Sequence, residues 1–401
     1  MLYLVASAAV VAAATAEMVP AGIVVGKGQT LEYTDKTIQT PSVTVESGGT
    51  LILSGTTLVM DGASNGTANI WVKGGTMKIL ASSEIKSANE NRYTFWVDAG
   101  STFEMRDSTM SGCGYQSVAD STKGLLIKAD GTTIENNDFG INYVCVIFDG
   151  TRNAKITGNR FSQCELQAAS VKNSNSAEIS SNEFSINDEQ RDSLLLSSCL
   201  SVIVSDNVFE NPFGIGLTTT NSSIIKNNEL RDSTGSSITI NAQGGYSKEN
   251  MLENNMVAGR LNIKGISNTV KGGAVRAELY IEGGANNNAF DGVDFSGATV
   301  TLNSGTTIGT AFDNNVFDGT EFTEDNAVVR LGNGNTLKNN AFGSNVTILV
   351  EGTGNTIEGV TITDAAGIMI SGGNLAAGEG SNVIRESTIA LQPGKSITCD
   401  G

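Results

Sequence analysis

Histidine is absent from this chain of 401 residues. Without an imidazole, Ser-His-Asp triads, Cys-His pairs and His-ligated zinc sites are all excluded. Charged residues make up only 17% of the chain and aromatic residues only 6%. The 25 Lys and Arg are outnumbered by 42 Asp and Glu, which leaves a net charge of −17. This acidic balance argues against a nucleic-acid partner, because phosphate binding needs clustered cations.

Proline is also rare, with 4 residues, whereas glycine is abundant, with 47. Hydrophobic residues reach 39%, which is low for a globular domain but too high for a disordered one. Gly, Asn, Ser and Thr fill the difference, and few windows are rich in Lys, Glu and Ala. This composition is typical of short strands joined by many tight turns.

The first sixteen residues predict export. Residues 2–16 are apolar and end in Ala14-Thr15-Ala16, a small-x-small sequence that suits cleavage after Ala16. The run is shorter than the roughly 20 residues needed to span a bilayer, and no Lys or Arg precedes it. We therefore expect a signal peptide at 1–16, with a buried N-terminal helix or strand as the alternative. We expect an extracellular or cell-surface location and no membrane anchor in the mature chain.

Five cysteines are an odd number, so in an exported chain at least one stays free or pairs between molecules. They are Cys113, Cys145, Cys164, Cys199 and Cys399. Cys399, near the chain end, is the candidate for an intermolecular disulfide. The other four fit buried thiols as well as they fit disulfides. The chain contains no Cys-x-x-Cys pair, so a zinc ribbon or a thioredoxin-like site has no support.

An internal repeat is the most informative feature of the sequence. Its unit is apolar-x-x-Asn-x-apolar, as in Ile156-Thr-Gly-Asn159-Arg-Phe161. The Asn anchors are Asn137, Asn159, Asn182, Asn207, Asn228, Asn255, Asn288, Asn315 and Asn340. Other residues occupy the anchor in the flanking repeats, namely Thr56, Ser83, Ser108, Val360 and Ser387. The mean step between anchors is about 25 residues, and the runs between them alternate with a period near two, which indicates strands.

A unit of this length without a helix cannot bury its apolar face alone, so units must stack. The repeat predicts an all-β parallel β-helix or solenoid of about 14 coils of roughly 25 residues, rounded or flattened into stacked β-arches. Asn side chains are expected to stack into a structural ladder at one turn, since such stacking satisfies turn backbone groups. The apolar position two residues on predicts a core ladder of Phe139, Phe161, Phe184, Phe209, Phe290, Phe317 and Phe342.

With these Asn-x-Phe steps the chain resembles right-handed parallel β-helix proteins, the architecture of pectate lyases and of many carbohydrate-binding surface proteins. The resemblance covers residues 46–401 as one solenoid domain, after a strand-like lead-in at 17–45. In its length, composition, export signal and repetition, the chain is also similar to the amyloid-like proteins of the tubular sheath of methanogenic archaea. That similarity implies laterally joined subunits and cross-linking by cysteine, and it carries over no functional residue.

Catalysis has little support in the sequence. The Asp-Asp pair and the Gly-His-Gly segment of polygalacturonase-type hydrolases are missing, and we expect no catalytic residue, cofactor or metal site. The acidic clusters Asp188-Glu189 and Glu324-Asp325 are expected in solvated turns. Three basic–acidic steps are expected to form turn salt bridges: Arg106-Asp107-Ser108, Arg191-Asp192-Ser193 and Arg231-Asp232-Ser233. Aromatic residues for stacking sugars are few, and Trp71, Tyr93, Trp96 and Tyr115 all fall in the first third of the chain.

These observations predict a structural cell-envelope protein that self-assembles through β-strand stacking, because no amphipathic helix is available to cover the solenoid ends. The alternatives are a polysaccharide lyase or hydrolase and a glycan-binding adhesin. The expected partner is the chain itself, with surface glycans or divalent cations as further candidates. Sequons at Asn65, Asn221 and Asn345 permit glycosylation.

Overall fold

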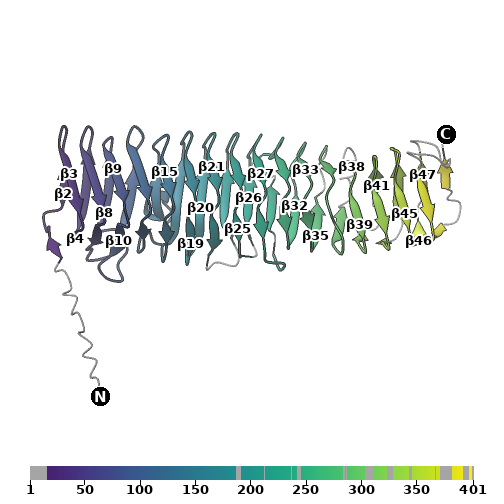
Figure 1. Cartoon of the computed structure of the whole chain (residues 1–401), viewed down its shortest axis with the longest axis horizontal. Coiled ribbons are helices and arrows are strands. Elements are labelled where there is room, and N and C mark those ends of the chain that lie inside the picture. Colours follow the sequence, from purple (N-terminus) through teal and green to yellow (C-terminus); the bar gives the residue numbers. More distant parts are fainter. Residues whose placement is uncertain are drawn as a thin grey trace, which may run out of the picture.

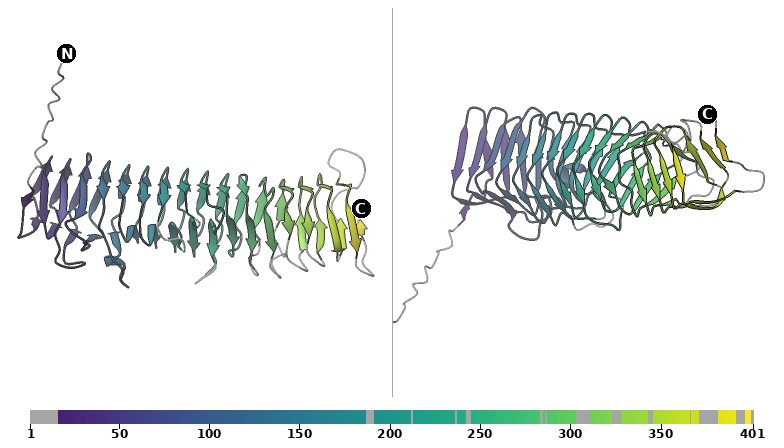
Figure 2. Two further views of the ribbon diagram at one scale, coloured as in Figure 1. Left: turned by 90° about the horizontal axis from the view of Figure 1, so that it is seen from below. Right: turned by 45° about the vertical axis from the view of Figure 1, so that its right-hand side comes forward.

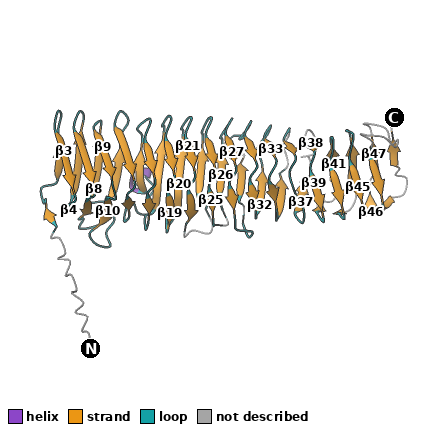
Figure 3. Cartoon of the chain, in the orientation of Figure 1, coloured by secondary structure: helices purple, strands orange, loops and turns teal. Residues whose placement is uncertain are grey.

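The computed structural model describes residues 16–186, 191–211, 213–235, 237–241, 245–282, 285, 287–302, 311–322, 328–342, 346–365, 367–370, 382–391 and 397–399. The described chain is built from short strands and one 3₁₀ helix, η1 (Asp120–Thr122) (Figure 3). Among the described residues no helix has the length and hydropathy to cross a membrane. The chain winds into a long rod whose first and last strands lie at opposite ends (Figure 1).

Strands of successive coils pair in parallel and form three long faces, which we name sheets A, B and C. Sheet A contains β1 (Glu17–Met18), β4 (Thr37–Thr40), β7 (Thr57–Met60), β10 (Glu84–Ser87), β13 (Thr109–Met110), β16 (Asp138–Phe139), β19 (Arg160–Ser162), β22 (Glu183–Ser185), β25 (Val208–Phe209), β28 (Glu229–Leu230), β31 (Met256–Val257), β34 (Ala274–Val275), β39 (Val316–Asp318), β42 (Thr336–Lys338), β45 (Thr356–Glu358) and β48 (Val383–Arg385). Single bridges through Asp294 join β34 to β39.

Sheet B contains β2 (Ile23–Val25), β5 (Ser42–Glu46), β8 (Asn69–Lys73), β11 (Thr94–Val97), β14 (Gly124–Ile127), β17 (Val144–Asp149), β20 (Gln167–Lys172), β23 (Leu194–Ser197), β26 (Ile215–Thr218), β29 (Ile238–Asn241), β32 (Arg260–Ile263), β35 (Glu278–Ile281), β37 (Thr299–Leu302), β40 (Glu321–Phe322), β43 (Ala341–Phe342), β46 (Thr361–Ala365) and β49 (Thr388–Leu391).

Sheet C contains β3 (Thr30–Thr34), β6 (Thr50–Ser54), β9 (Thr76–Leu80), β12 (Thr102–Arg106), β15 (Thr133–Glu135), β18 (Lys155–Thr157), β21 (Glu178–Ser180), β24 (Ile203–Ser205), β27 (Ile224–Lys226), β30 (Met251–Glu253), β33 (Thr269–Lys271), β36 (Ala289–Asp291), β38 (Ala311–Asp313), β41 (Val328–Leu331), β44 (Thr347–Val350), β47 (Gly367–Ile370) and β50 (Ile397–Cys399).

The all-β parallel solenoid predicted from the repeat is confirmed, and its coils follow one another without a break (Figure 2). Sheets B and C each contain seventeen described strands, so the coils are more numerous than the repeat alone suggests. One reason is that residues 17–45 are part of the solenoid, since β1, β2 and β3 pair with β4, β5 and β6. Another is that the coils after Asn255 are shorter. Two coils, which pass through Ala274 and Asp294 in sheet A, fit between Asn255 and Asn315.

Alternation along each strand builds the core. In β5, Val43 and Val45 are fully buried, whereas Ser42, Thr44 and Glu46 between them are half-buried on the outer face. The same pattern continues through the solenoid and produces one connected apolar core along the rod. Each buried aliphatic or aromatic side chain contributes roughly 1.5–3 kcal/mol to folding, which compensates for the small number of apolar residues in each strand.

Six Asn anchors form a continuous ladder at the corner between sheets C and A, from Asn137 to Asn255. Asn159 shows the pattern: its backbone N–H donates to Oδ1 of Asn182 (2.9 Å). Its Nδ2 donates to the same oxygen (3.0 Å) and to the carbonyl of Ile134 one coil back (2.9 Å). One buried side chain therefore satisfies backbone groups of its own coil and of the coil before it, where the chain leaves one sheet and enters the next.

The residue before each of these anchors has a left-handed backbone. Asn136, Ser181 and Asn227 have φ of 54°, 57° and 54°, and Gly158 has φ of 67°. Only small or Asx-type residues adopt this conformation at low cost. This requirement explains why Asn, Gly, Ser or Asp precedes the buried Asn in the repeat.

Four of the predicted anchors lie at other corners. Asn288 continues a second ladder with Asn250 and Asn268 between sheets B and C. Asn340, Val360 and Ser387 lie between sheets A and B. Asn315 is at the original corner, where it begins a further run of three anchors that the repeat search missed, namely Asn335, Asn355 and Asn382. The same Asn-x-apolar step fits any corner at which the chain turns into a new strand, so the motif cannot identify its corner.

The phenylalanines divide in the same way. Phe139, Phe161, Phe184 and Phe209 stack in sheet A with centroids 4.5–5.1 Å apart. The other predicted members belong to three separate stacks, in the pairs Phe290–Phe312, Phe295–Phe317 and Phe322–Phe342. The single core ladder of the sequence prediction is therefore four stacks, two of them in sheet A and one each in sheets B and C.

Candidate functional site

The two tryptophans of the chain lie side by side on the outer face of sheet B. Trp71 in β8 and Trp96 in β11 are register partners on neighbouring coils. Their ring centroids are 5.9 Å apart and their planes meet at 80°, an edge-to-face arrangement. Ile70 and Val72 on either side of Trp71 are fully buried, so alternation along the strand directs the indole outward.

Charged groups surround this tryptophan pair. The indole N–H of Trp71 donates to Oδ2 of Asp98 (2.7 Å). Nζ of Lys73 lies 4.8 Å from the centroid of the Trp71 ring, within cation–π range. Nζ of Lys128, which lines the same cavity, is 3.9 Å from a carboxylate oxygen of Asp149. Aromatic surface, hydrogen-bond donors and an acceptor are thus brought together on one face.

The loop between β13 and β14, residues 111–123, forms a wall beside the pair. The indole N–H of Trp96 donates to the backbone carbonyl of Ser121 in this loop. Leu126 and Ile147, which follow Trp96 in the same outward register of sheet B, are only 7% and 1% exposed. The outer face of the sheet is therefore covered at these coils and opens at the tryptophan pair.

Asp120 fixes the loop to the sheet. Its two carboxylate oxygens accept from Nζ of Lys123 (2.9 Å) and of Lys172 (2.8 Å). Burial raises the pKa of the Asp120 carboxyl, but these two ammonium groups outweigh burial and hold the pKa below its ordinary value. The wall is therefore held by a charged contact that persists at neutral pH.

The cavity at the pair has a volume of about 330 Å³. Its walls are Trp71, Trp96, Val97, Asp98, Ser121, Leu126 and Lys128. Asp98 is the one carboxylate among these described walls, so the cavity offers no pair of carboxylates for acid–base chemistry. Indole surface with a few polar groups at its rim is the composition of a binding site.

Asp192 is a buried carboxylate that lies against sheet B, away from the tryptophan pair. A Cβ on Gly216 would lie 2.1 Å from Oδ2 of Asp192, so only glycine leaves room for the carboxylate at that position. Burial raises the pKa of Asp192 to about 6, and nearby Arg191 lowers it only in part. The expected turn salt bridge between these two residues does not form, because the Asp192 carboxylate packs against the sheet.

The other two basic–acidic steps form ion pairs with different partners. Arg106 pairs with Glu104 and Glu135, and Arg231 pairs with Glu210 and Glu229. In each case the arginine contacts one glutamate of its own coil and one of a neighbouring coil. These glutamates point to the same face as the arginine, whereas the aspartate next to it in sequence points to the opposite face. The clusters Asp188-Glu189 and Glu324-Asp325 lie outside the described residues.

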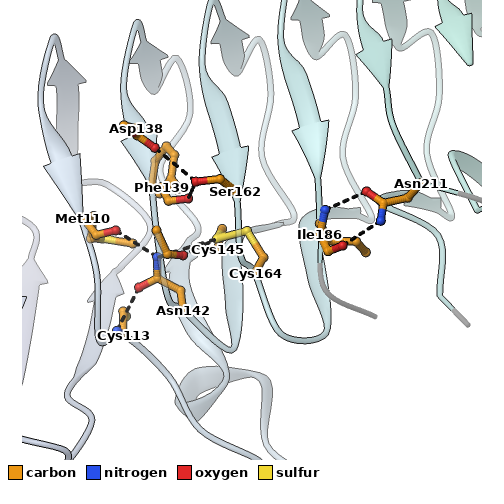
Figure 4. The surroundings of a disulfide bond; sticks show 11 residues. Met110, Cys113, Asp138, Phe139, Asn142, Cys145, Ser162, Cys164, Ile186 and Asn211 are labelled. Carbon is orange, nitrogen blue, oxygen red and sulfur yellow. Dashed lines mark hydrogen bonds between the residues drawn. A yellow bond between two sulfur atoms is a disulfide. The ribbon is translucent and has the colours of Figure 1, made fainter. Parts of the chain in front are cut away.

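Two cysteines form a disulfide within the solenoid. Cys145 and Cys164 are bonded, with 19 residues of sequence separation (Figure 4). Cys113 and Cys199 are buried free thiols, and burial raises the pKa of both. The side chain of Cys399 lies outside the described residues, so its intermolecular disulfide stays a prediction.

Two of the three sequons fall on described residues. Asn65 is exposed, and its Oδ1 accepts from the backbone N–H of Arg92 (2.8 Å). Asn221 is half-buried, and its Oδ1 accepts from the backbone N–H of Lys248 (3.0 Å). Asn345 lies outside the described residues.

The tryptophan pair is a candidate binding cluster that the sequence did not reveal as a pair. Trp71 and Trp96 are 25 residues apart, which is the mean step of the repeat. In a solenoid, residues one step apart lie on neighbouring coils and on the same face. The spacing therefore contained the signal, but the small total number of aromatic residues obscured it.

Two protein-family models match parts of the chain. The right-handed β-helix region matches residues 123–275, and the model of the periplasmic copper-binding protein NosD matches residues 10–193. The first match agrees with the β-helix that the structure shows, and the likeness to a periplasmic protein agrees with export. No curated protein matches the sequence of this chain.

Solved structures are similar to the chain at low identity. The periplasmic alginate epimerase AlgG is 10% identical, with a TM-score of 0.36, over 92% of this chain and 85% of that one. The DFA-IIIase of Arthrobacter chlorophenolicus A6 without its lid is 13% identical, with a TM-score of 0.33, over 90% and 89% of the two chains. The Dettilon tailspike protein is 13% identical, with a TM-score of 0.27, over 92% and 60%.

Proposed function

We propose that the protein is an exported, non-catalytic β-helix that binds glycan chains at the cell surface. The observation that carries this proposal is the cavity at Trp71 and Trp96. An indole face stacks on the C–H face of a pyranose, and the polar rim of Asp98 and Lys128 suits its hydroxyl groups. Because the rod is rigid and stacked, the rings are held in place before a ligand arrives, which lowers the entropic cost of binding.

Binding rather than cleavage fits the walls of the cavity. Glycoside hydrolysis uses two carboxylates on either side of the scissile bond, and Asp98 is the one carboxylate among the described walls of the cavity. Copper binding, which the name of one matched model suggests, does not fit either. The chain has no histidine, and no group of three or more Cys, Asp or Glu side chains in the described part could hold a metal ion.

Glycan binding is tested with the full chain on immobilised polysaccharides and in solution by calorimetry. Wild type is expected to bind and to release the glycan uncleaved. Trp71→Ala is expected to lose most of the affinity while keeping its circular dichroism spectrum. Release of shortened oligosaccharides would establish an enzyme, and unchanged binding by Trp71→Ala would remove the site from the proposal.

A structural, self-assembling role in the envelope is the second candidate, and the first coil favours it. Leu31 and Tyr33 in β3 are only partly buried, whereas their register partners Leu51 and Leu53 are fully buried. Val24 in β2 is 64% exposed. No described residue pairs with the outer edge of β2 or β3, and such an edge is a template for another strand.

Self-assembly is tested by negative-stain electron microscopy of residues 17–401, with and without reductant. Rings, sheets or tubes would support the structural role, and their loss on reduction would assign the link to a cysteine. Monodisperse single rods at all concentrations would exclude assembly as an intrinsic property. Leu31→Glu, which places a charge at the open edge, is expected to block any end-to-end polymer.

A further inference from the structure

The outer face of sheet B forms an open strip that leads to the tryptophan pair. Val24, Thr44, Trp71 and Trp96 are successive register partners on the first four coils. Adjacent coils are about 4.8 Å apart, so the strip is about 14 Å long. It ends at the wall formed by residues 111–123, where the next partner, Leu126, is covered. An extended ligand therefore fits along the axis of the rod.

A row of charges of alternating sign runs beside this strip. Each charged residue comes directly after the last buried residue of a strand in sheet B. In coil order the row is Glu46, Lys73, Asp98, Lys128 and Asp149. Backbone hydrogen bonds keep the row in register, from Asp98 N–H to the carbonyl of Val72 (2.9 Å) and from Lys128 N–H to that of Val97 (2.8 Å).

Alternation decides what kind of polymer this row can hold. Carboxylates and ammonium groups one coil apart cancel at long range, so the row offers no net attraction to a polyanion. At close range the same groups alternate as acceptors and donors, which matches hydroxyl groups because each hydroxyl both donates and accepts. The net charge of −17 adds long-range repulsion against any acidic polymer.

We propose that the tryptophan strip takes an uncharged pyranose chain, laid along the rod axis, and rejects polyuronides. The inference rests on the proposed glycan binding and adds its charge class. Trp71 and Trp96 supply the stacking surface, and Asp98 and Lys128 hydrogen-bond the hydroxyl groups. The selectivity comes from the charge row and not from the rings, since an indole face stacks on neutral and acidic pyranoses alike.

The test compares hexasaccharides of equal length by calorimetry with the full chain. Cellohexaose, maltohexaose and mannohexaose are the neutral probes, and hexagalacturonate is the acidic one. At least one neutral probe is expected to bind, with affinity unchanged within about twofold between about 50 mM and about 500 mM NaCl. Trp71→Ala is expected to weaken it roughly tenfold. Tyr280→Ala, in the same outward register further along the rod, serves as the matched control and is expected to bind like wild type.

Charge reversal tests the selectivity, and the affinity of the same variant for the neutral probes reports the effect of losing the bond between Asp98 and Trp71. Asp98→Lys, which turns Lys73 and Lys128 into a continuous cationic row, is expected to admit hexagalacturonate with a strong salt dependence. Tighter binding of hexagalacturonate than of every neutral probe by wild type would overturn the inference while glycan binding stands. Failure of all four probes to bind would overturn both this inference and the proposed function.

Discussion

The indole N–H of Trp71 donates to the carboxylate of Asp98, which lies on the next coil two residues after Trp96. This bond joins the ring of Trp71 to the coil that carries Trp96. Neighbouring coils are joined mainly by backbone pairing and core ladders, and here a side-chain bond on the outer surface joins them as well. The bond fixes the orientation of the Trp71 indole on the outer face of sheet B.

The buried Asn ladder is expected to dominate local stability. Asn182→Ala removes Nδ2 bonds to the carbonyl of Ile156 and to Asn207, and it leaves the backbone N–H of Asn159 without its acceptor. Buried polar groups left unpaired cost about 1–3 kcal/mol each, so we expect a loss of about 2–4 kcal/mol in the free energy of unfolding, measured by urea denaturation.

Ser181→Gly is the matched control for the ladder variant. Ser181 precedes Asn182, is exposed and has φ of 57°. Glycine accepts this backbone without strain, so the free energy of unfolding is expected to change by less than about 1 kcal/mol. Equal destabilisation by Asn182→Ala and Ser181→Gly would contradict a special role for the ladder.

Stability is expected to depend on pH through Asp192. Its pKa in the folded protein, about 6, lies above the value of an unfolded chain. The folded state therefore binds the proton more tightly, and the resulting stabilisation is complete below about pH 4 and lost as the pH rises through 6. The loss is roughly 3 kcal/mol. Asp192→Asn is expected to remove this part of the pH dependence and to be more stable than wild type at pH 7, as measured by urea midpoints from about pH 4 to about pH 7.5. Parallel pH profiles for the two proteins would show that Asp192 does not titrate in this range.

The cysteines are expected to separate into two chemical classes. In native protein, alkylation with iodoacetamide followed by mass spectrometry should leave Cys113 and Cys199 unmodified, because both thiols are buried and their pKa values are raised. Cys145 and Cys164 should react only after reduction and unfolding. The double variant Cys145→Ala, Cys164→Ala is expected to lose about 3 kcal/mol in the free energy of unfolding. Rapid native labelling of Cys113 would contradict the packing described here.

The wall of the tryptophan site is expected to loosen when Asp120 loses its charge. Asp120→Asn breaks both ion pairs with Lys123 and Lys172, so hydrogen exchange in residues 115–123 should accelerate while the melting temperature of the rod is nearly unchanged. In wild type the pKa of the Asp120 carboxyl is lowered, so this carboxyl stays charged at pH values where an ordinary aspartate would be protonated. The same loosening is therefore expected only when the pH falls below the ordinary pKa of an aspartate. Glu183→Gln, which removes an exposed pair with Arg160 at 3.8 Å, is the control and should leave exchange unaltered.

Much of the fold could be read from particular residues. Ile156, Asn159 and Phe161 alone indicate the local design, with a strand, a buried corner and a second strand. The four-membered Phe stack and the six-membered Asn ladder lie where their spacing predicts. The same reasoning placed Asn288 and Asn340 in that ladder incorrectly, because coil length varies and a corner motif does not state which corner it makes.

The candidate site was less accessible from sequence. Trp71 and Trp96 have the spacing of one coil, but nothing local shows that their side chains face outward or that residues 111–123 close one end. The row of charges of alternating sign is equally difficult to recognise in the sequence. Its members are about 20–30 residues apart, and they form a row only when the coils stack in register.

The sequence by itself determined that the chain stacks repeating coils of short strands, because a repeat without helices can bury its apolar side chains only against its neighbours. The tertiary structure alone decided how many corners each stretch makes, which cysteines pair and which aromatic residues meet. These depend on the register between coils, and a shift of one residue turns every side chain of a strand to the opposite face.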